Sequence, residues 1–215
     1  MSGHATAVIP VKPLERALGR LGEVLDAAAR RDLQWEMLGA VLRACTEATR
    51  VERVVVVTAD RAVGGLARAF GARVVPDHRP PRGMNAAVIA GCDVAAAAGA
   101  RAALVLTADL PLASAGDLDA VVARAPDAPG VVCVPSRDGT GTNALLLCGP
   151  RVLEPRLGPH SLAAHTAQAR ARGLALVRWE APALALDVDT PEDLAVLGDI
   201  APGWAAAAGM ALTPA

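Results

Sequence analysis

The sequence has few aromatic side chains and almost no lysine. Its 215 residues include one Phe, three Trp and no Tyr, and its 21 basic residues are twenty Arg and a single Lys, Lys12. So few rings cannot form the row of stacking aromatics that single-strand nucleic-acid binders use. The formal net charge of −1 also argues against general binding of nucleic acid or of an anionic membrane surface.

Long apolar runs and paired cysteines are also missing. The four cysteines form no C-x-x-C pair and have no His at metal-ligand spacing, so we interpret them as small buried side chains in a reducing compartment. Charges interrupt the apolar stretches well short of the about 20 residues that span a bilayer. The first residues lack the basic and apolar regions of a signal peptide. We therefore expect a cytoplasmic protein with no membrane partner.

What the chain does have is enough apolar content for a core, at 53% hydrophobic residues. Short β-rich runs alternate with Ala/Leu/Arg-rich helical stretches, which predicts an α/β fold with a doubly wound, mostly parallel sheet. We expect one domain over residues 1–200 and a flexible tail over 201–215, where Ala, Gly and Pro lack any period. The predicted strands are 5–11, 53–58, 73–75, 102–107, 130–134, 143–148, 174–179 and 183–188, and the predicted helices are 26–49, 60–70, 85–98, 114–125, 162–172 and 191–197.

A basic loop follows the first predicted strand. It contains Lys12 and Arg20, and doubly wound sheets bind their ligands beyond the carboxyl ends of their strands. An ammonium and a forked guanidinium suit a polyphosphate there; a solvated basic loop is the alternative. The chain has no G-x-x-x-x-G-K-[ST] P-loop, and no G-x-G-x-x-G follows this strand, which argues against a dinucleotide dehydrogenase.

Acidic residues follow two other strands. Asp109 comes directly after strand 102–107, where a carboxylate is placed to bind Mg²⁺ or to begin a helix. Asp187 and Asp189 are two residues apart at the end of predicted strand 183–188, so they share one face. Two carboxylates on one face repel each other unless a cation lies between them. An ordinary helix N-cap explains Thr190 and the Pro after it, but not this pair.

Three further polar segments are candidate ligand sites. Residues 139–143 (Gly-Thr-Gly-Thr-Asn) offer backbone N–H groups and hydroxyls for a small anion. Residues 158–161 (Gly-Pro-His-Ser) precede a predicted helix, whose N-terminus suits a phosphate or carboxylate. Asn85 either contacts a nucleobase or ribose, or caps the helix that it opens. No Ser–His–Asp or metal-binding His cluster is evident in the sequence.

Taken in order, these motifs resemble the CofC/FbiD guanylyltransferases of coenzyme F-420 biosynthesis, within the molybdopterin-guanylyltransferase-like nucleotidyltransferases. The resemblance covers roughly residues 7–197. It rests on Ile-Pro-Val-Lys-Pro-Leu (9–14) with Arg20, Val-Val-Val-Thr-Ala-Asp (55–60), Gly-Ala-Arg-Val-Val-Pro-Asp (71–77), Met-Asn-Ala-Ala (84–87), Ala-Asp-Leu-Pro-Leu (108–112), Gly-Thr-Gly-Thr-Asn-Ala-Leu (139–145), Gly-Pro-His-Ser (158–161) and Leu-Asp-Val-Asp-Thr-Pro-Glu-Asp-Leu (186–194).

The resemblance implies a Rossmann-like nucleotidyltransferase that moves GMP from GTP to a three-carbon phospho-acid and releases pyrophosphate. Bacterial members resemble enzymes that use phosphoenolpyruvate; 2-phospho-L-lactate and 3-phosphoglycerate are the alternatives. The downstream deazaflavin transferase is an expected partner. By this match Lys12 and Arg20 hold the GTP phosphates and Asn85 contacts the nucleotide. Asp109, Asp187 and Asp189 are the expected Mg²⁺ ligands, and Thr142, Gly158 and Ser161 the expected acceptor-binding residues.

No general base is required, since a phosphate monoester is mostly ionised at neutral pH, with a second pKa of about 6. Two other functions remain open from the sequence: a cytidylyl- or molybdopterin-type transferase with another acceptor, and a non-catalytic nucleotide-binding protein.

Overall fold

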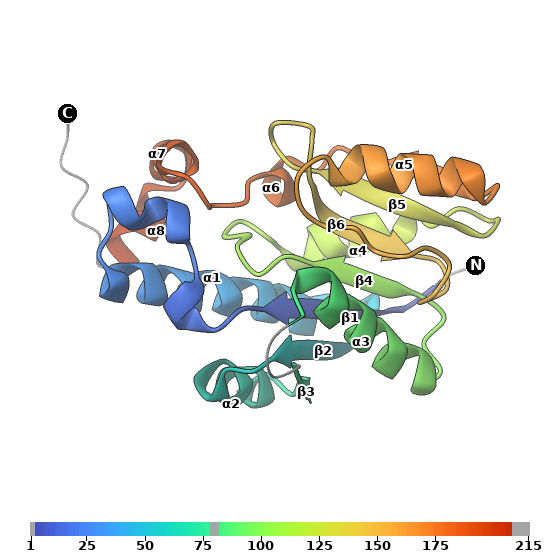
Figure 1. The fold of residues 1–215 in the computed structure, drawn as a ribbon, viewed down its shortest axis with the longest axis horizontal. Helices are drawn as coiled ribbons and strands as arrows, with labels where there is room; N and C mark the ends of the chain where they lie inside the picture. The colour runs from blue at the N-terminus through green and yellow to red at the C-terminus, as the bar shows by residue number, and fades with distance from the viewer. Residues whose placement is uncertain (1–2, 78–81, 208–215) are drawn as a thin grey trace.

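The computed structural model describes residues 3–77 and 82–207, which form one seven-stranded sheet (Figure 1). The strand order is β3-β2-β1-β4-β6-β5-β7, and β6 alone among these strands runs antiparallel to its neighbours. The doubly wound, mostly parallel α/β fold is therefore confirmed. The strands are β1 (Ala5–Val11), β2 (Val51–Thr58), β3 (Arg73–Pro76), β4 (Ala103–Leu106), β5 (Gly130–Pro135), β6 (Thr142–Leu147) and β7 (Ala175–Arg178).

Helices cover both faces of the sheet, each over its own apolar core. One core lies under α1, α2 and α4 and includes Ile9, Leu106 and Leu146, and the other lies under α3 and α5 and includes Val8, Val105 and Leu145. Consecutive strand residues thus bury side chains on opposite faces, as a doubly covered sheet requires. These helices are α1 (Ala27–Glu47), α2 (Arg61–Ala69), α3 (Met84–Ala97), α4 (Ala115–Ala123) and α5 (Ser161–Ala171).

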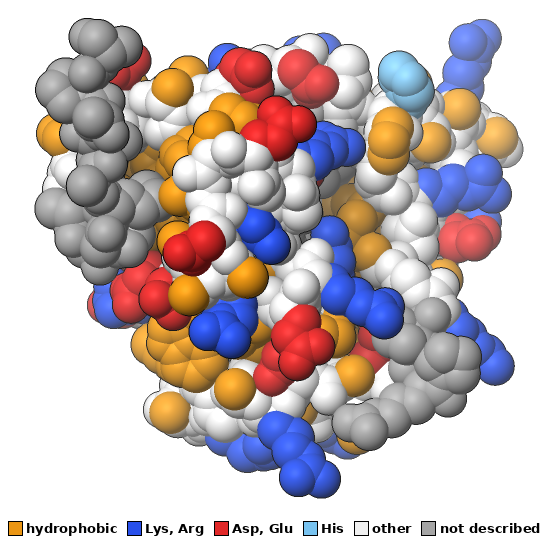
Figure 2. Space-filling view, turned by 60° about the vertical axis from the view of Figure 1, so that its left-hand side comes forward, with side chains coloured by type: hydrophobic (Ala, Val, Ile, Leu, Met, Phe, Trp, Pro, Cys, Tyr) orange, Lys and Arg blue, Asp and Glu red, His pale blue; other side chains and the backbone are white. Residues whose placement is uncertain are grey.

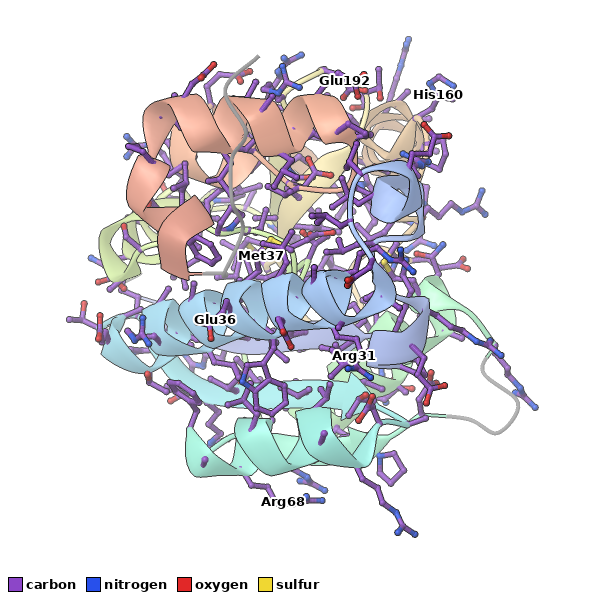
Figure 3. The ribbon with its side chains drawn as sticks, turned by 90° about the vertical axis from the view of Figure 1, so that its left-hand side faces the viewer. Arg31, Glu36, Met37, Arg68, His160 and Glu192 are labelled. Atoms are coloured by element: carbon purple, nitrogen blue, oxygen red, sulfur yellow. The ribbon has the colours of Figure 1, made fainter. Side chains whose placement is uncertain are left out.

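A third apolar cluster attaches the C-terminal segment to the domain. In it Met37 of α1 packs with Val188 and with Leu197 of α7 (Pro191–Ile200), and Figure 3 shows Met37 pointing from α1 toward the C-terminal helices. The expected tail from residue 201 instead begins with helix α8 (Pro202–Ala207), whose Trp204 packs against this cluster. The rest of the expected tail, 208–215, lies outside the described residues.

The predicted strand 183–188 is wrong. Its chain forms the short helix α6 (Pro182–Ala185) followed by extended backbone that belongs to no sheet. The alternating burial that suggested a strand is real, because Leu184, Leu186 and Val188 are buried. The backbone groups bind loops instead of a strand: the carbonyl of Ala185 accepts from the Arg137 N–H at 2.8 Å, and the Val188 N–H donates to the Asp109 carbonyl at 3.0 Å.

Side-chain caps fix where several helices begin. Asp26 and Asp60 accept backbone N–H groups at the starts of α1 and α2, and Ser114 and Thr190 form reciprocal capping boxes with Asp117 and Asp193. Across residues 3–77 and 82–207, no helix combines the length and apolarity needed to cross a bilayer.

Candidate active site at the carboxyl edge of the sheet

The sequence-predicted site residues gather at one edge of the sheet. Strands β1 and β4 end there, and β6 begins there because it runs antiparallel to β4. This edge faces left in Figure 1 and comes forward in Figure 2, where Lys and Arg side chains lie along a hollow with acidic side chains beside them. Basic and acidic side chains together at the carboxyl edge of a sheet suit a ligand that carries both phosphates and a bound cation.

A β-bulge at the start of β6 separates two neighbouring side chains. The register changes from Val134↔Ala144 to Pro135↔Thr142, so Asn143 is the extra residue. Thr142 consequently contacts α5, on the face that also buries Leu145, while Asn143 turns to the opposite side. Bulges commonly re-aim a side chain beside a functional site.

The Asn143 amide organises the acidic segment. Its Nδ2 lies 3.0 Å from the carbonyl oxygens of Leu184 and Ala185 and 3.0 Å from Asp187 Oδ1. Asn143 is 4% exposed, so these partners replace water for its donors. The amide therefore fixes Asp187 against the end of β4, where Asp109 lies.

Asp109 and Asp187 form a half-buried pair of like charge. Burial, and then the nearby Asp187 carboxylate, raise the pKa of Asp109 to about 6. Burial also raises the pKa of Asp187, against the hydrogen bond from Asn143. Asp109 Oδ1 and Thr107 Oγ1 are buried and make no hydrogen bond of normal geometry with the described residues, although a weak contact between these two side chains lowers the pKa of Asp109. Buried carboxylates of like charge are stabilised when a cation joins them.

These two carboxylates fit a magnesium ion. Mg²⁺ is commonly bound by one or two carboxylates together with water and substrate phosphates, and it needs no cage built wholly of protein. The buried Asp109 oxygen is of the chemical type that such a site needs, and its role as a ligand stays a prediction. In the part of the chain that the structure describes, no three His, Cys, Asp or Glu side chains are grouped closely enough to enclose a metal by themselves.

The third predicted metal ligand, Asp189, is paired with a predicted phosphate ligand. Its Oδ2 lies 3.3 Å from Arg20 Nη1. The neighbouring Arg137 donates to Asp193 at 2.7 Å and faces the same acidic segment. Asp189 and Arg20 thus neutralise each other here, and their ligand roles stay predictions.

Lys12 directly follows the carboxyl end of β1. Its side chain is exposed, and it forms no salt bridge with the described residues. The loop behind it is held by Asp60, whose Oδ2 accepts the Leu14 N–H at 3.0 Å while its Oδ1 caps α2. Leu18, buried and left-handed at φ 51°, then turns the chain toward Arg20.

The three predicted acceptor residues lie together. Ser161 Oγ is 3.2 Å from Thr142 Oγ1, and the Ser161 N–H donates to the Gly158 carbonyl at 3.1 Å. Gly158 has φ +120°, a conformation that only glycine adopts readily. Beside them a groove of about 890 Å³ runs along α5, lined by Gly139, Thr140, His160, Leu162, Ala163, Thr166, Ala167, Arg170 and Ala171.

Asn85 is engaged by the loop that precedes α5. Its Oδ1 accepts the Leu157 N–H at 2.7 Å and its Nδ2 donates to the Leu157 carbonyl at 3.2 Å. It does not cap α3, whose N-cap is Gly83. Contact with the nucleotide stays a prediction for this residue.

Sequence reasoning missed Asn143, His165 and Asp60. Asn143 follows Thr142 within the quoted 139–145 motif, and that adjacency was a usable signal. His165 is fully buried and contacts Thr142; an isolated His inside a helix gives no such indication. Asp60 ends the quoted 55–60 motif after β2, so its position at the carboxyl edge was the signal.

Comparison with known proteins identifies the family of this chain. Residues 5–200 match the family model described as guanylyl transferase CofC like. A phosphoenolpyruvate guanylyltransferase of Conexibacter woesei is 42% identical over 90% of this chain and 87% of its own length. A 3-phospho-D-glycerate guanylyltransferase of Phenylobacterium zucineum is 40% identical over 88% and 87%.

Solved structures share the fold of this chain. A solved structure from Desulfovibrio desulfuricans G20, named for nucleotide-diphospho-sugar transfer, superposes with a TM-score of 0.72 at 16% identity, over 91% of this chain and 86% of that one. At that identity the likeness shows the fold alone. The family match, with the relatives at about 40% identity, shows that this chain is a guanylyltransferase of the CofC family.

Proposed function

We propose that this guanylyltransferase transfers GMP from GTP to phosphoenolpyruvate and releases pyrophosphate, as a step of coenzyme F-420 biosynthesis. The observation that carries the proposal is that a pair of carboxylates and a pair of hydroxyls lie at the same edge of the sheet. The Asp109–Asp187 pair and the Thr142–Ser161 hydroxyl pair both lie at this edge, and consecutive residues of β6 hold them, since Asn143 is bonded to Asp187 and Thr142 to Ser161. The name of the Conexibacter relative supports phosphoenolpyruvate as acceptor.

The transfer needs positioning and charge neutralisation more than proton transfer. An oxygen of the acceptor's ionised phosphate forms a bond to the α-phosphorus of GTP, and the bond from that phosphorus to the bridging oxygen breaks. Pyrophosphate leaves with the electron pair, giving enolpyruvoyl-2-diphospho-5'-guanosine. Lys12 and Arg20 hold the β- and γ-phosphates from the loop after β1, which favours departure of the pyrophosphate.

Asp109 and Asp187 would hold Mg²⁺, with Asp189 beside them once Arg20 turns to the phosphates. A bound Mg²⁺ supplies neutralisation of the negative charge on the phosphate oxygens. The chain's own part is to hold the two carboxylates at fixed positions near each other. Asn143 does this for Asp187, and the Val188–Asp109 backbone hydrogen bond ties the two segments together.

The experiment is pyrophosphate release from GTP and Mg²⁺ with phosphoenolpyruvate, 2-phospho-L-lactate or 3-phospho-D-glycerate in parallel reactions. A second set contains the downstream deazaflavin transferase, which we expect to consume a labile product. Release with phosphoenolpyruvate alone supports the proposal. Release with 3-phospho-D-glycerate alone would contradict phosphoenolpyruvate as the acceptor. It would assign to this chain the acceptor named for the Phenylobacterium relative.

Two controls separate the rival functions. CTP in place of GTP, at equal concentration, tests for a cytidylyltransferase; we expect no release with it. Chelation of the metal with EDTA should stop release, and added Mg²⁺ should restore it. Stabilisation by GTP without release for any acceptor, with or without the partner enzyme, would contradict catalysis and leave a nucleotide-binding protein.

A further inference from the structure

His165 links the loop before α5 to the hydroxyl pair of the acceptor site. The imidazole is 0% exposed. Its Nε2 accepts the backbone N–H of Arg156 at 2.9 Å, and its Nδ1 lies 3.2 Å from Thr142 Oγ1. Thr142 Oγ1 in turn lies 3.2 Å from Ser161 Oγ. A continuous chain of hydrogen bonds therefore runs from the Arg156 backbone to Ser161.

The Arg156 backbone fixes which ring nitrogen carries the proton. A backbone N–H can only donate, so Nε2 must offer its lone pair, and the proton of a neutral ring then sits on Nδ1. Burial lowers the pKa of His165 to about 4, so the ring is neutral near pH 7. Nδ1–H consequently donates to Thr142 Oγ1.

This direction decides what the hydroxyl pair can offer to a ligand. Thr142 and Ser161 have two O–H protons, and one of them is used between the two oxygens. With Nδ1 as donor, the second proton stays available. With the opposite tautomer, Thr142 would donate to Nδ1 and Ser161 to Thr142, and no donor would remain. An anionic oxygen accepts hydrogen bonds only, so it needs the first arrangement.

We propose that His165 is a positioning residue that orients the Thr142–Ser161 pair so that it presents an O–H donor to an anionic oxygen of the acceptor. The inference rests on the proposed function, which seats the acceptor at these two hydroxyls. His165 touches neither substrate nor the reacting atoms; it acts through Thr142.

Three substitutions separate this role from a merely structural one. In His165→Asn the amide nitrogen stands where Nδ1 stands and still donates to Thr142, whereas the Arg156 N–H is no longer reached. In His165→Gln the amide stands where Nε2 stands, so Arg156 keeps its partner and Thr142 does not. His165→Leu removes both bonds at similar volume. Gln168→Ala is the matched control, because Gln168 also joins α5 to this loop, through the Glu154 carbonyl at 3.0 Å.

The measurement is the initial rate of pyrophosphate release, with KM for acceptor and for GTP determined separately. We expect His165→Leu and His165→Gln to raise the acceptor KM roughly tenfold, because Thr142 loses the donor that orients its O–H toward the ligand, while the GTP KM stays within about twofold. His165→Asn and Gln168→Ala should stay within about threefold of wild type. A purely structural role would instead rank the variants by melting temperature, with equal changes in both KM values, and that ranking would overturn the inference.

A double-mutant cycle and a spectrum complete the test. In a Thr142→Val background, His165→Leu should change the acceptor KM by less than about twofold; an additive effect would contradict action through Thr142. Nitrogen-15 NMR of the wild-type imidazole should show a protonated Nδ1 and an unprotonated Nε2, and the reverse tautomer would overturn the inference without any assay.

If wild type releases no pyrophosphate with any acid, the proposed function fails and the inference falls with it. Normal wild-type release with unchanged variants removes the inference alone.

Discussion

Arg20 Nη1 lies 3.3 Å from Asp189 Oδ2, so an ion pair joins the loop after β1 to the segment before α7 across the carboxyl edge of the sheet. The two side chains are 69% and 34% exposed, and such pairs contribute about 0–1 kcal/mol to stability. A bond this weak is readily exchanged for a stronger one. A polyphosphate at this edge would take over the guanidinium and release the carboxylate.

Arg20→Ala tests this exchange. We expect the KM for GTP to rise about tenfold, because a guanidinium–phosphate contact is lost, while the free energy of unfolding changes by less than about 1 kcal/mol. The assay is pyrophosphate release at varied GTP, with urea unfolding alongside. Arg31→Ala is the control, since Arg31 is exposed on α1 and forms no salt bridge with the described residues. An unchanged GTP KM in Arg20→Ala would contradict the assignment.

Asp109→Asn tests the carboxylate pair. Turnover should fall about a hundredfold or more, because a charged ligand for the metal is lost. Stability should not fall, since the change removes one of two like charges in a buried site. Pyrophosphate release and thermal unfolding measure the two effects. The surface control Asp127→Asn should leave both unchanged. A rate near wild type in Asp109→Asn would contradict the metal-binding role.

Asn143→Ala removes the amide that holds the acidic segment. Three acceptors lose their donor, namely two backbone carbonyls and Asp187. We expect a loss of about 1–3 kcal/mol in the free energy of unfolding and, because Asp187 is no longer fixed, a fall in kcat. Urea unfolding and initial rates check this. Full stability together with full activity would show that the bulge at β6 does not serve the site.

The pH dependence of stability should carry the signature of His165. The pKa of its imidazole is lowered by burial from 6.5 to about 4 in the folded chain, so between those values the unfolded chain binds the extra proton. The contribution of the neutral His165 imidazole to the free energy of unfolding is fully present above about pH 6.5. It is lost as the pH falls toward 4, by on the order of 3 kcal/mol.

Urea unfolding between pH 7 and 4.5, compared for wild type and His165→Gln, isolates that contribution. The slope with pH should be shallower in the variant. His160→Asn, at an exposed His of the same segment, should keep the wild-type slope. Identical slopes for wild type and His165→Gln would show that the imidazole is not held neutral.

Gly91→Ala tests how closely α3 approaches the sheet. A Cβ at this position would lie 2.4 Å from Val8 Cγ1 and 3.0 Å from Val57 Cγ2, so we expect a loss of about 1–3 kcal/mol by overpacking. Gly39→Ala in α1 is the matched control, because no atom lies within 4 Å of its Cβ. That change should stabilise by about 0.5–1 kcal/mol. Thermal unfolding of both variants is the check, and equal effects would contradict the packing argument.

Local pattern was sufficient for most of the elements. Strand β1 was predicted with both ends correct, since a buried seven-residue run between polar residues fixes it. The start of α4 followed from Ser114, and the start of α7 from two cap candidates, Asp189 and Thr190, of which Thr190 is the cap, because capping is a contact within four residues. The basic loop after β1 and Asp109 after β4 lie at one edge as expected, since a parallel sheet brings its strand ends together, whereas Asp187 and Asp189 follow no strand.

Long-range partners decided the rest. The 183–188 segment has the alternation of a strand, yet Asn143 and Arg137 bind its backbone carbonyls, and no strand edge does. The bulge that sends Thr142 to α5 and Asn143 to Asp187 arises from pairing with β5. The tautomer of His165 depends on a backbone N–H nine residues away along the chain.

The sequence by itself determined the alternation of strands and helices, the caps and the motifs, because these depend on neighbouring residues and on the two periodicities of the backbone. Only the tertiary structure decided which carboxylates face each other, which amide holds Asp187 and which way the acceptor-site hydroxyls point. Those properties depend on burial and on hydrogen-bond partners far apart in the chain, and no local pattern encodes them.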